Sequence, residues 1–541
     1  MTEISAQATR WGMVVDLGRC VGCQTCTIAC KMENGLPPGT LWRTVLDVES
    51  GEFPDVRRQF VPLTCMHCAD PPCHDACPTT ATRVRPDGIV WIANDLCIGC
   101  GSCVVACPYQ ARHLVPKERY YFGAPTAPEL ATYDRSRVGI CTKCHFCFHK
   151  FDEAPPGAVP GRDPEYTPSC SSSCIADAIL FGDLNNPESR VGRLLAQGRQ
   201  GGRMLEHLDT QPSVYYLNAP RMDPLPPRLQ HSWHRLAVAN FFAGPTGVGL
   251  YLLATLWGWR QGGMRPLLAL SDPRGSLAAL LSHGPGALQW AGLLGPALVA
   301  VGLLSVAAEA GRPLRGFNVL RNVRRSWMSR ESAFALVFMA LATLDTLLWA
   351  SPPVQLLAAL SGMGLVLAQG VILSKAKGVP AWNVPIMPLH FVTSGLTSGA
   401  GALLVLLGLA GSGEGLPLLA GVTATLVALD LLVWYRYLAT PARTGTFAQA
   451  VAVLRRRRTH LAIVGIGHWL PLVLLALTWS ESQAGASFTA GVVILIGGWL
   501  TRSTLIRKAG FVVDLFDRFG LAGAGQDQTA DRGEGARPLA A

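Results

Sequence analysis

The sequence predicts two unlike parts, an α+β domain rich in cysteine followed by an all-α bundle of about eight membrane-spanning helices. All 17 cysteines of the 541-residue chain lie between Cys20 and Cys174. Residues 236–505 contain no cysteine and consist mainly of Leu, Ala, Gly and Val. Between the two parts, residues 218–235 hold four prolines, which favours an extended connection. The predicted boundaries are therefore 1–217, 218–235 and 236–505, followed by a partly disordered tail over 506–541.

Sixteen of the cysteines form four groups of four. The first and third groups read C-x2-C-x2-C-x3-C, the second reads C-x2-C-x4-C-x3-C, and the fourth joins two distant pairs. In bacterial ferredoxins such a run gives three thiolates to one 4Fe-4S cluster and a fourth to its neighbour. The sequence therefore predicts a ferredoxin-like domain of two dicluster repeats with four 4Fe-4S clusters. The predicted iron ligands are Cys20, Cys23, Cys26 and Cys30; Cys65, Cys68, Cys73 and Cys77; Cys97, Cys100, Cys103 and Cys107; and Cys144, Cys147, Cys170 and Cys174.

Zinc and disulfides are weaker interpretations of this pattern. Structural zinc sites usually split four ligands into two pairs a dozen or more residues apart, whereas the first group places four cysteines within eleven residues. Disulfides between such close cysteines would strain the bridging geometry, and clusters need reduced thiolates. In the fourth group, Cys141 offers a second overlapping C-x2-C pair, so the spacing alone leaves its membership open.

The end of this domain resembles the four-cluster subunits of molybdopterin oxidoreductases such as dimethyl sulfoxide, polysulfide and tetrathionate reductases. The fourth motif of that family looks like K-C-x-F-C-x-H-R/K, and residues 143–150 read KCHFCFHK. The resemblance continues through FGDLNNP at 181–187 and PSVYY at 212–216. It implies that Cys144 and Cys147 are ligands and that Cys141 is a spare thiol. It also implies that the first and fourth groups share one cluster pair and the second and third share the other, with crossovers at Cys30, Cys174, Cys77 and Cys107.

Eight apolar stretches follow, most of them close to the roughly 20 residues that a spanning helix requires. Their glycines and prolines are tolerable because packed neighbours can satisfy the freed backbone groups. This part resembles the quinone-reactive membrane anchors of the same enzyme family, in RSWMSRE at 325–331 and PAWN at 380–383. The predicted spans lie near 236–258, 288–309, 332–351, 354–373, 384–411, 416–435, 461–479 and 484–501.

The charges of the loops predict the orientation. With eight spans, the cysteine-rich domain and the tail share a side with the loops at 310–331, 374–383 and 436–460, which together carry 14 Lys or Arg. The opposite loops carry three arginines. The positive-inside rule then places the cysteine-rich domain on the cytoplasmic side of the inner membrane, and residues 1–10 show no export signal. Membrane topology also explains the net charge of +10, so lipid is expected as a partner and nucleic acid is not.

Ionisable side chains inside the spans are costly in hydrocarbon and are functional candidates. Counted at 1.5 Å per residue, four of them lie near the cytoplasmic helix ends, at the level nearest the predicted clusters: His390, His468, Asp430 and Glu309. We predict that they contact an exchangeable quinone or exchange its protons, although each could equally be an interhelical hydrogen-bonding residue. Haem b between His390 and His468 is a weaker interpretation, because no second histidine pair exists and the resembling anchors generally lack haem.

No nucleophile, catalytic dyad or nucleotide-binding loop accompanies the cysteines, so substrate chemistry is predicted on another polypeptide. The resemblance implies that this partner is a catalytic subunit with molybdopterin of the bis-guanine-dinucleotide type, and that the chain fuses two subunits. We predict electron transfer from a cytoplasmic oxidation to quinone. The alternatives are a quinol-oxidising subunit of an exported anaerobic respiratory reductase, a non-catalytic metal-binding membrane scaffold, and a proton-pumping module that uses the deeper Asp345.

Overall fold

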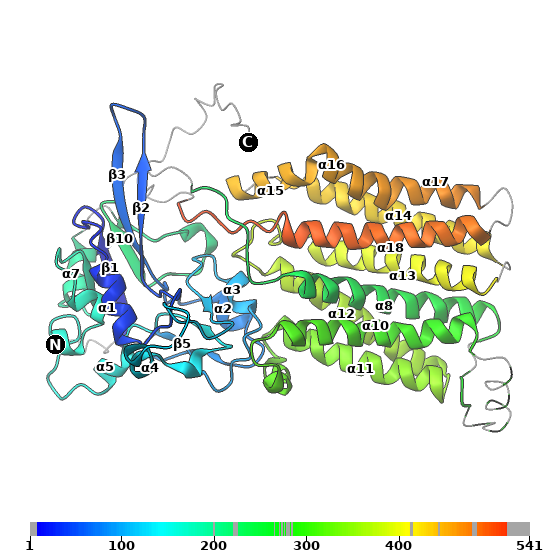
Figure 1. The fold of residues 1–541 in the computed structure, drawn as a ribbon, viewed down its shortest axis with the longest axis horizontal. Coiled ribbons are helices and arrows are strands. Elements are labelled where there is room, and N and C mark those ends of the chain that lie inside the picture. Colours follow the sequence, from blue (N-terminus) through cyan, green and yellow to red (C-terminus); the bar gives the residue numbers. More distant parts are fainter. Residues whose placement is uncertain are drawn as a thin grey trace, which may run out of the picture.

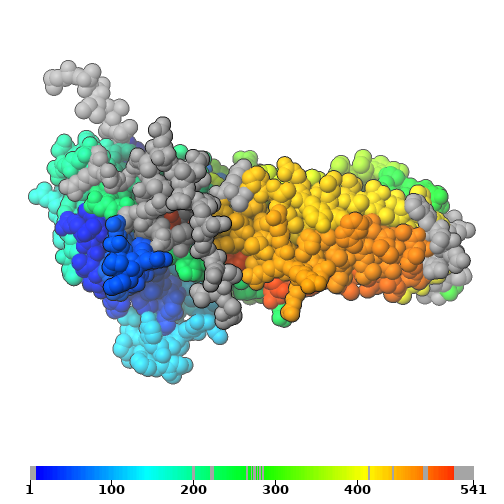
Figure 2. All heavy atoms as spheres, turned by 90° about the horizontal axis from the view of Figure 1, so that it is seen from above, coloured from blue at the N-terminus to red at the C-terminus, as the bar shows by residue number. Residues whose placement is uncertain are grey.

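The computed structural model describes residues 8–516, apart from 198–200, 220–224, 264–265, 270, 272–273, 275, 277, 279–281, 283–284, 412–414, 442–443 and 479–483. It is elongated, with strands and short helices at one end and long helices side by side at the other (Figure 1). The space-filling view shows the rod of long helices, in yellow and orange, running into the domain built from blue and cyan residues (Figure 2). The α+β part and the all-α part predicted from composition are both present.

A four-stranded sheet of order β8-β1-β10-β9 organises the cysteine-rich domain. Its central strand β1 (Trp11–Asp16) pairs with β8 (Ile179–Asp183) in antiparallel and with β10 (Val214–Leu217) in parallel orientation, and β9 (Gly201–Gly202) closes the edge. Met13, Val14 and Val15 are fully buried, because a central strand covered on both faces needs apolar side chains on each. The sheet joins the two ends of the domain, and this brings the first and fourth cysteine groups together.

Short elements that carry or support the cysteines surround this sheet. Three two-stranded antiparallel sheets are formed by β2 (Thr44–Ser50) and β3 (Arg57–Leu63), β4 (Thr82–Val84) and β5 (Val90–Ile92), and β6 (His113–Leu114) and β7 (Cys141–Thr142). The hairpin β2–β3 projects beyond the rest of the domain (Figure 1). The helices and 3-10 turns are α1 (Thr25–Glu33), α2 (Pro72–Asp75), α3 (Ser102–Ala106), α4 (Ala127–Thr132), η1 (Arg135–Arg137), α5 (Phe148–Asp152), η2 (Pro164–Tyr166), α6 (Ser169–Ser172), α7 (Arg190–Ala196) and η3 (Glu206–Leu208).

Each of the eight predicted spans corresponds to a long helix or helical run. These are α8 (Arg235–Arg260), α10 (Ala287–Glu309), α11 (Trp327–Leu347), α12 (Pro352–Ser374), α13 (Met387–Leu409), α14 (Leu416–Leu438), the run of α16 (Arg457–His460), π-helical η5 (Leu461–Trp469) and α17 (Leu470–Leu477), and α18 (Ala484–Arg507). The turn η4 (Pro313–Asn322) precedes α11, and α15 (Gly445–Arg455) precedes α16.

Seven of these helices, within the described residues, are long and apolar enough to cross a membrane. The exception is α11, which carries Arg330, Glu331 and Asp345 and is therefore less apolar than the others. It packs between α10 and α12 as a member of the bundle. Seven of the eight predicted spans therefore meet the criteria of length and composition for crossing a membrane. That α11 also crosses stays a prediction.

The helix α8 is central to the bundle and packs against α10, α12, α13 and α18. Where α8 meets α10, a Cβ atom on Gly247 would lie 2.3 Å from the carbonyl oxygen of Gly295. Close backbone approach at small residues is the usual way in which helices associate in membranes. These contacts hold the helix ends in fixed positions beneath the cysteine-rich domain.

Loops at one end of the bundle contact the cysteine-rich domain directly. The backbone N–H of Arg312 donates to the carbonyl of Ile98 at 3.0 Å, and that of Gly378 donates to Val105 at 3.1 Å. After α18 the chain returns to this boundary, where the N–H of Val513 donates to Gly378 at 3.0 Å. The first part of the predicted tail is ordered and packs against the cysteine-rich domain. Its side chains Val513, Leu515 and Phe516 are buried in the core of that domain. The tail predicted to be partly disordered spans 506–541, and its residues 517–541 lie outside the described residues.

Candidate iron-sulfur and quinone sites

The structure gathers the sixteen predicted cysteines into four sets. Sets A, C and D each line a small cavity, and the thiols of set B interact electrostatically with one another. The members are Cys20, Cys23, Cys26 and Cys174 in set A; Cys30, Cys144, Cys147 and Cys170 in set B; Cys65, Cys68, Cys73 and Cys107 in set C; and Cys77, Cys97, Cys100 and Cys103 in set D. Cys30, Cys174, Cys77 and Cys107 therefore lie where the implied crossovers put them.

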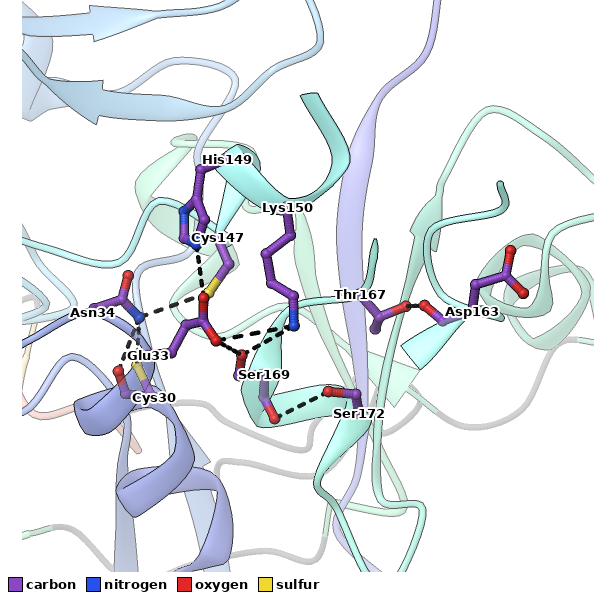
Figure 3. Close-up of polar contacts among 10 residues, drawn as sticks. All are labelled: Cys30, Glu33, Asn34, Cys147, His149, Lys150, Asp163, Thr167, Ser169 and Ser172. Atoms are coloured by element: carbon purple, nitrogen blue, oxygen red, sulfur yellow. Dashed lines mark hydrogen bonds and ion pairs between the residues drawn. The ribbon is translucent and has the colours of Figure 1, made fainter. Parts of the chain in front are cut away.

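Set B shows how the local fold holds the thiols (Figure 3). The side-chain amide of Asn34, at the end of α1, lies 3.8 Å from the sulfur of Cys30 and 3.7 Å from that of Cys147. The neighbouring Glu33 accepts from the Ser169 hydroxyl at 2.7 Å, which ties α1 to the helix α6 that bears Cys170. One short helix thus positions cysteines that are more than 100 residues apart in the sequence.

The four sets follow one another in a row. Electrostatic interaction between thiols links Cys26 of set A with Cys170 of set B, Cys144 of set B with Cys65 of set C, and Cys73 of set C with Cys103 of set D. Set A is at the surface, where Cys23 is exposed. Set D is at the membrane boundary, where the Trp233 indole donates to the carbonyl of Cys100 at 3.1 Å.

Gly99 shows why the set D loop needs glycine. Its φ of +71° lies in the left-handed region, and a Cβ atom there would be 2.3 Å from the carbonyl oxygen of Gly139 and 3.0 Å from the amide nitrogen of Gly311. Gly311 belongs to the loop that follows α10. The glycine therefore lets the cysteine loop lie against the membrane part without a side chain between them.

The chemistry of these donors fits iron-sulfur clusters. Burial raises the pKa of Cys97 to about 11 and that of Cys107 to about 12. At these two positions the thiolate, the form that binds metal, is therefore disfavoured unless positive charge accompanies it. Iron bound by four thiols around each small cavity would supply that charge.

Cys141, which was expected to be a spare thiol, lies beside set D. It is 1% exposed on β7, and its sulfur is 3.5 Å from that of Cys103. Its backbone N–H also donates to the sulfur of Cys97 at 3.5 Å. The overlapping spacing associated Cys141 with the fourth cysteine group, whereas the strand pairing of β7 with β6 carries it to the third.

Comparison with known proteins identifies both parts of the chain. A family model described as a 4Fe-4S dicluster domain matches residues 56–121, and one described as polysulphide reductase, NrfD matches residues 286–514. A selenate reductase subunit of Mesobacillus selenatarsenatis is 40% identical over 38% of this chain and 72% of its own length. The iron-sulfur cluster-binding subunit of menaquinone reductase from Nitratidesulfovibrio vulgaris is 39% identical over 40% and 92%. A tetrathionate reductase subunit of Salmonella typhimurium is 36% identical over 38% and 72%.

The chain belongs to the family of iron-sulfur subunits of molybdopterin oxidoreductases. Its second half is an NrfD-type membrane domain, so this iron-sulfur subunit is fused to its own multi-pass anchor. The resemblance predicted from the motifs is thereby confirmed. Because the relatives are subunits of oxidoreductase complexes, the fused iron-sulfur subunit is part of a redox complex that includes a catalytic partner.

Three of the four predicted quinone or proton residues meet in the anchor of the iron-sulfur subunit. Asp430 of α14 lies 3.4 Å from the Nδ1 atom of His390 on α13, and its other oxygen is 3.3 Å from the Nε2 atom of His468 in η5. All three side chains are buried. The Thr393 hydroxyl donates to the same carboxylate at 2.7 Å. A π-helical segment is a frequent device at functional sites, and here it turns His468 toward the carboxylate.

Glu309 is not part of this group. It ends α10, and its carboxylate accepts the backbone N–H of His234 at 2.9 Å, which caps the start of α8. Within the described part of the chain, no hydrogen bond or ion pair joins Glu309 to Asp430 or to either histidine. The structure therefore brings three of the four residues together and places Glu309 apart from them.

Sequence reasoning missed a cavity of about 370 Å³ at the boundary between set D and the bundle. Arg325 on its wall donates to the Nδ1 atom of His74 at 3.2 Å. Burial lowers the pKa of His74, and the Arg325 charge lowers it further, so the neutral imidazole can accept this bond. The only sequence signal was the RSWMSRE motif, which contributes three lining residues. The lining residues are Asp70, Pro72, Asp75, Ala76, Ser102, Val105, Ala106, Trp233, Arg325, Trp327, Met328, Ile372, Lys375, Ala376 and Lys377.

Proposed function

We propose that this iron-sulfur subunit carries electrons between a catalytic molybdopterin subunit and the membrane quinone pool through four 4Fe-4S clusters held by sets A to D. The observation that carries the proposal is the row of four thiol sets from an exposed face to a cavity at the membrane boundary. Clusters bound there would supply one-electron transfer. The direction we favour is from a cytoplasmic oxidation to quinone, and the menaquinone reductase relative supports quinone as the acceptor.

The cavity beside set D is the proposed quinone site. Its volume is within the usual range of small-molecule sites, and it combines apolar walls with a few charged groups. Ser102, next to the ligand Cys103, lies on one wall, and Ile372 of α12 lies on another. A quinone ring held there would border both the set D loop and the lipid-facing helices.

His390, Asp430 and His468 lie outside the lining of this cavity. We propose that they move protons within the bundle and do not contact the quinone ring. Both imidazoles face one carboxylate, and this arrangement supports proton handling over haem b ligation. Replacement of Asp430 would separate the histidines without altering the thiol sets.

The surface around set A is the proposed docking face for the catalytic subunit, whose molybdopterin would be of the bis-guanine-dinucleotide type. Four large apolar side chains near the set A cysteines are exposed: Val21, Ile28, Met32 and Ile175. Each of them lies within six residues of a set A cysteine in the sequence. Exposed apolar patches of this kind mark interaction sites. A partner bound there would approach the outermost thiol set.

The proposal is tested by purifying the tagged chain without oxygen from detergent-solubilised membranes and measuring iron, zinc and molybdenum together. We expect about sixteen iron atoms per chain and a co-purifying molybdenum protein. Zinc in place of iron would indicate a metal-binding scaffold. Full iron without molybdenum would leave the clusters in place and remove the proposed partner.

Replacing Met32 and Ile175 together with glutamate is expected to abolish co-purification of the molybdenum protein. Two charges placed in an apolar contact face typically weaken binding by at least about tenfold. Val159→Glu is the matched control, because Val159 is an exposed valine elsewhere in the domain. Unchanged recovery of the partner by the double variant would exclude this face.

A fluorescent protein fused after residue 541 is expected to fluoresce, because the C-terminus shares the side of the iron-sulfur domain and the reporter then folds in the cytoplasm. Val513 and Phe516 pack into that domain, so the reporter gives the location of both. A fusion to alkaline phosphatase should be inactive. Active phosphatase with a dark fluorescent fusion would instead favour the exported reductase.

A further inference from the structure

In the described part of the iron-sulfur domain, three cationic side chains are buried without an acidic partner. Arg43 is 1% exposed, and Arg112 and Lys143 are each 3% exposed. Among the residues that the structure describes, no ion pair joins any of them to a carboxylate; their bonds go to sulfur, hydroxyl and carbonyl groups. A buried charge without a counter-charge is strongly unfavourable. Each of these cations therefore needs an anion close by.

Arg43 lies between sets A and B. Its Nη2 atom is 3.4 Å from the sulfur of Cys170 in set B and 3.1 Å from that of Met13. It interacts electrostatically with Cys26 of set A as well. The Nε and Nη1 atoms are buried and have no hydrogen-bond partner among the residues that the structure describes. These free donors are what an additional anionic group between the two thiol sets would satisfy.

Arg112 occupies the corresponding place between sets C and D. Its Nη2 atom donates to the sulfur of Cys73 in set C at 2.9 Å, and its Nη1 atom donates to the Thr82 hydroxyl at 3.1 Å. The guanidinium also interacts with Cys103 of set D. The two arginines thus stand in equivalent positions, one in each cluster pair.

Lys143 lies at the junction between the two pairs. Its ammonium group donates to the carbonyls of Val90 and Cys144. Its charge acts on Cys144 of set B and on Cys73 of set C. Every gap in the row from set A to set D therefore contains one buried cation.

We propose that three buried cations tune the electron path, namely Arg43, Lys143 and Arg112. Each of them raises the electron affinity of the two clusters that flank it. The inference rests on the proposed function, because it requires clusters in the four sets. Clusters bound in neighbouring sets would exchange one electron at a time, one being oxidised as the next is reduced, and a fixed cation between them would stabilise the electron on either side. The arginines do so without exchanging a proton, since a guanidinium stays protonated.

The test is a redox titration of the purified full-length chain, followed by the electron paramagnetic resonance of its clusters, for Arg112→Met and Arg43→Met. We expect each variant to make two of the four clusters at least tenfold harder to reduce, which is about 59 mV for a one-electron couple. Arg112→Met should affect one pair and Arg43→Met the other. Arg112→Lys and Arg43→Lys keep the charge and should recover most of the shift.

Arg162→Met is the matched control, because Arg162 is exposed in the same domain and its loss should leave all four potentials unchanged. Iron is measured in every sample. Iron lost from Arg112→Met but retained in Arg112→Lys would also support the proposal, because the charge is then what holds the clusters. Three outcomes would overturn the proposal. They are full iron with unchanged potentials, an equal shift in the potentials of all four clusters, and loss of iron from both Arg112→Met and Arg112→Lys. A wild-type chain without four clusters would instead contradict the proposed function.

Discussion

Replacing Cys100 with serine is expected to lower the iron content from about sixteen to about twelve atoms per chain and to stop reduction of the remaining clusters by quinol. Cys100 belongs to set D, and the carbonyl of the same residue accepts the Trp233 indole at the membrane boundary. A serine keeps this backbone bond and removes only the thiolate. Iron analysis and the visible absorbance of the chain after addition of a quinol analogue measure the two effects.

Cys141→Ser is the matched control for this experiment. Cys141 is a buried thiol at the same cavity, 3.5 Å from the sulfur of Cys103. If the family motif assigns the ligands correctly, this variant keeps its full iron content. Loss of iron from Cys141→Ser with retention in Cys100→Ser would exchange the roles of the two cysteines. Loss from both would show that Cys141, which lies beside Cys103, is also needed to hold the cluster.

The thiol sets could be predicted from the sequence because ligand spacing is a local property. A C-x2-C-x2-C run brings three sulfurs to one point whatever the rest of the chain does, and the sheet that joins β1 to β8 and β10 brings the distant members together. Cys141 shows the limit of spacing. Its place beside set D depends on the pairing of Leu114 with Cys141 between two short strands, which no sequence pattern indicated.

For the ionisable residues of the membrane part, the sequence could predict only their depth along the helices. Counting residues along a helix gives depth, but it does not say which helices are neighbours. His390, Asp430 and His468 meet because α13, α14 and η5 are adjacent, whereas Glu309 ends a helix that packs against α8 and α11. The cavity was harder still to predict from the sequence, because its walls come from separate segments. Its lining residues, such as Ala106 and Ile372, are also ordinary in any apolar helix.

The buried cations were overlooked for a related reason. Arg43, Arg112 and Lys143 are three among 46 Lys and Arg in the sequence, and most such residues are exposed. Only their burial without acidic partners distinguishes them. Burial is a property of the folded chain, so this feature required the structure.

Replacing Ile372 with tryptophan is expected to slow reduction of the clusters by a quinol analogue by at least about tenfold. Ile372 is a half-buried residue on the α12 wall of the cavity, and a larger ring there fills space that the quinone ring needs. The thiol sets are untouched, so a small chemical reductant should still bleach the visible absorbance at the wild-type rate. The ratio of the two rates separates blocked entry of quinol from damage to the clusters.

Leu367→Trp is the control for the size of the new side chain. Leu367 lies on the same helix and is 41% exposed, so it points away from the packed interior, and its replacement should leave the quinol rate unchanged. Equal slowing in both variants would indicate a general disturbance of α12. An unchanged rate in Ile372→Trp would move the quinone site away from the cavity, and the group of His390, Asp430 and His468 would then be the next place to test, because it combines burial with proton-exchanging side chains at the same end of the bundle.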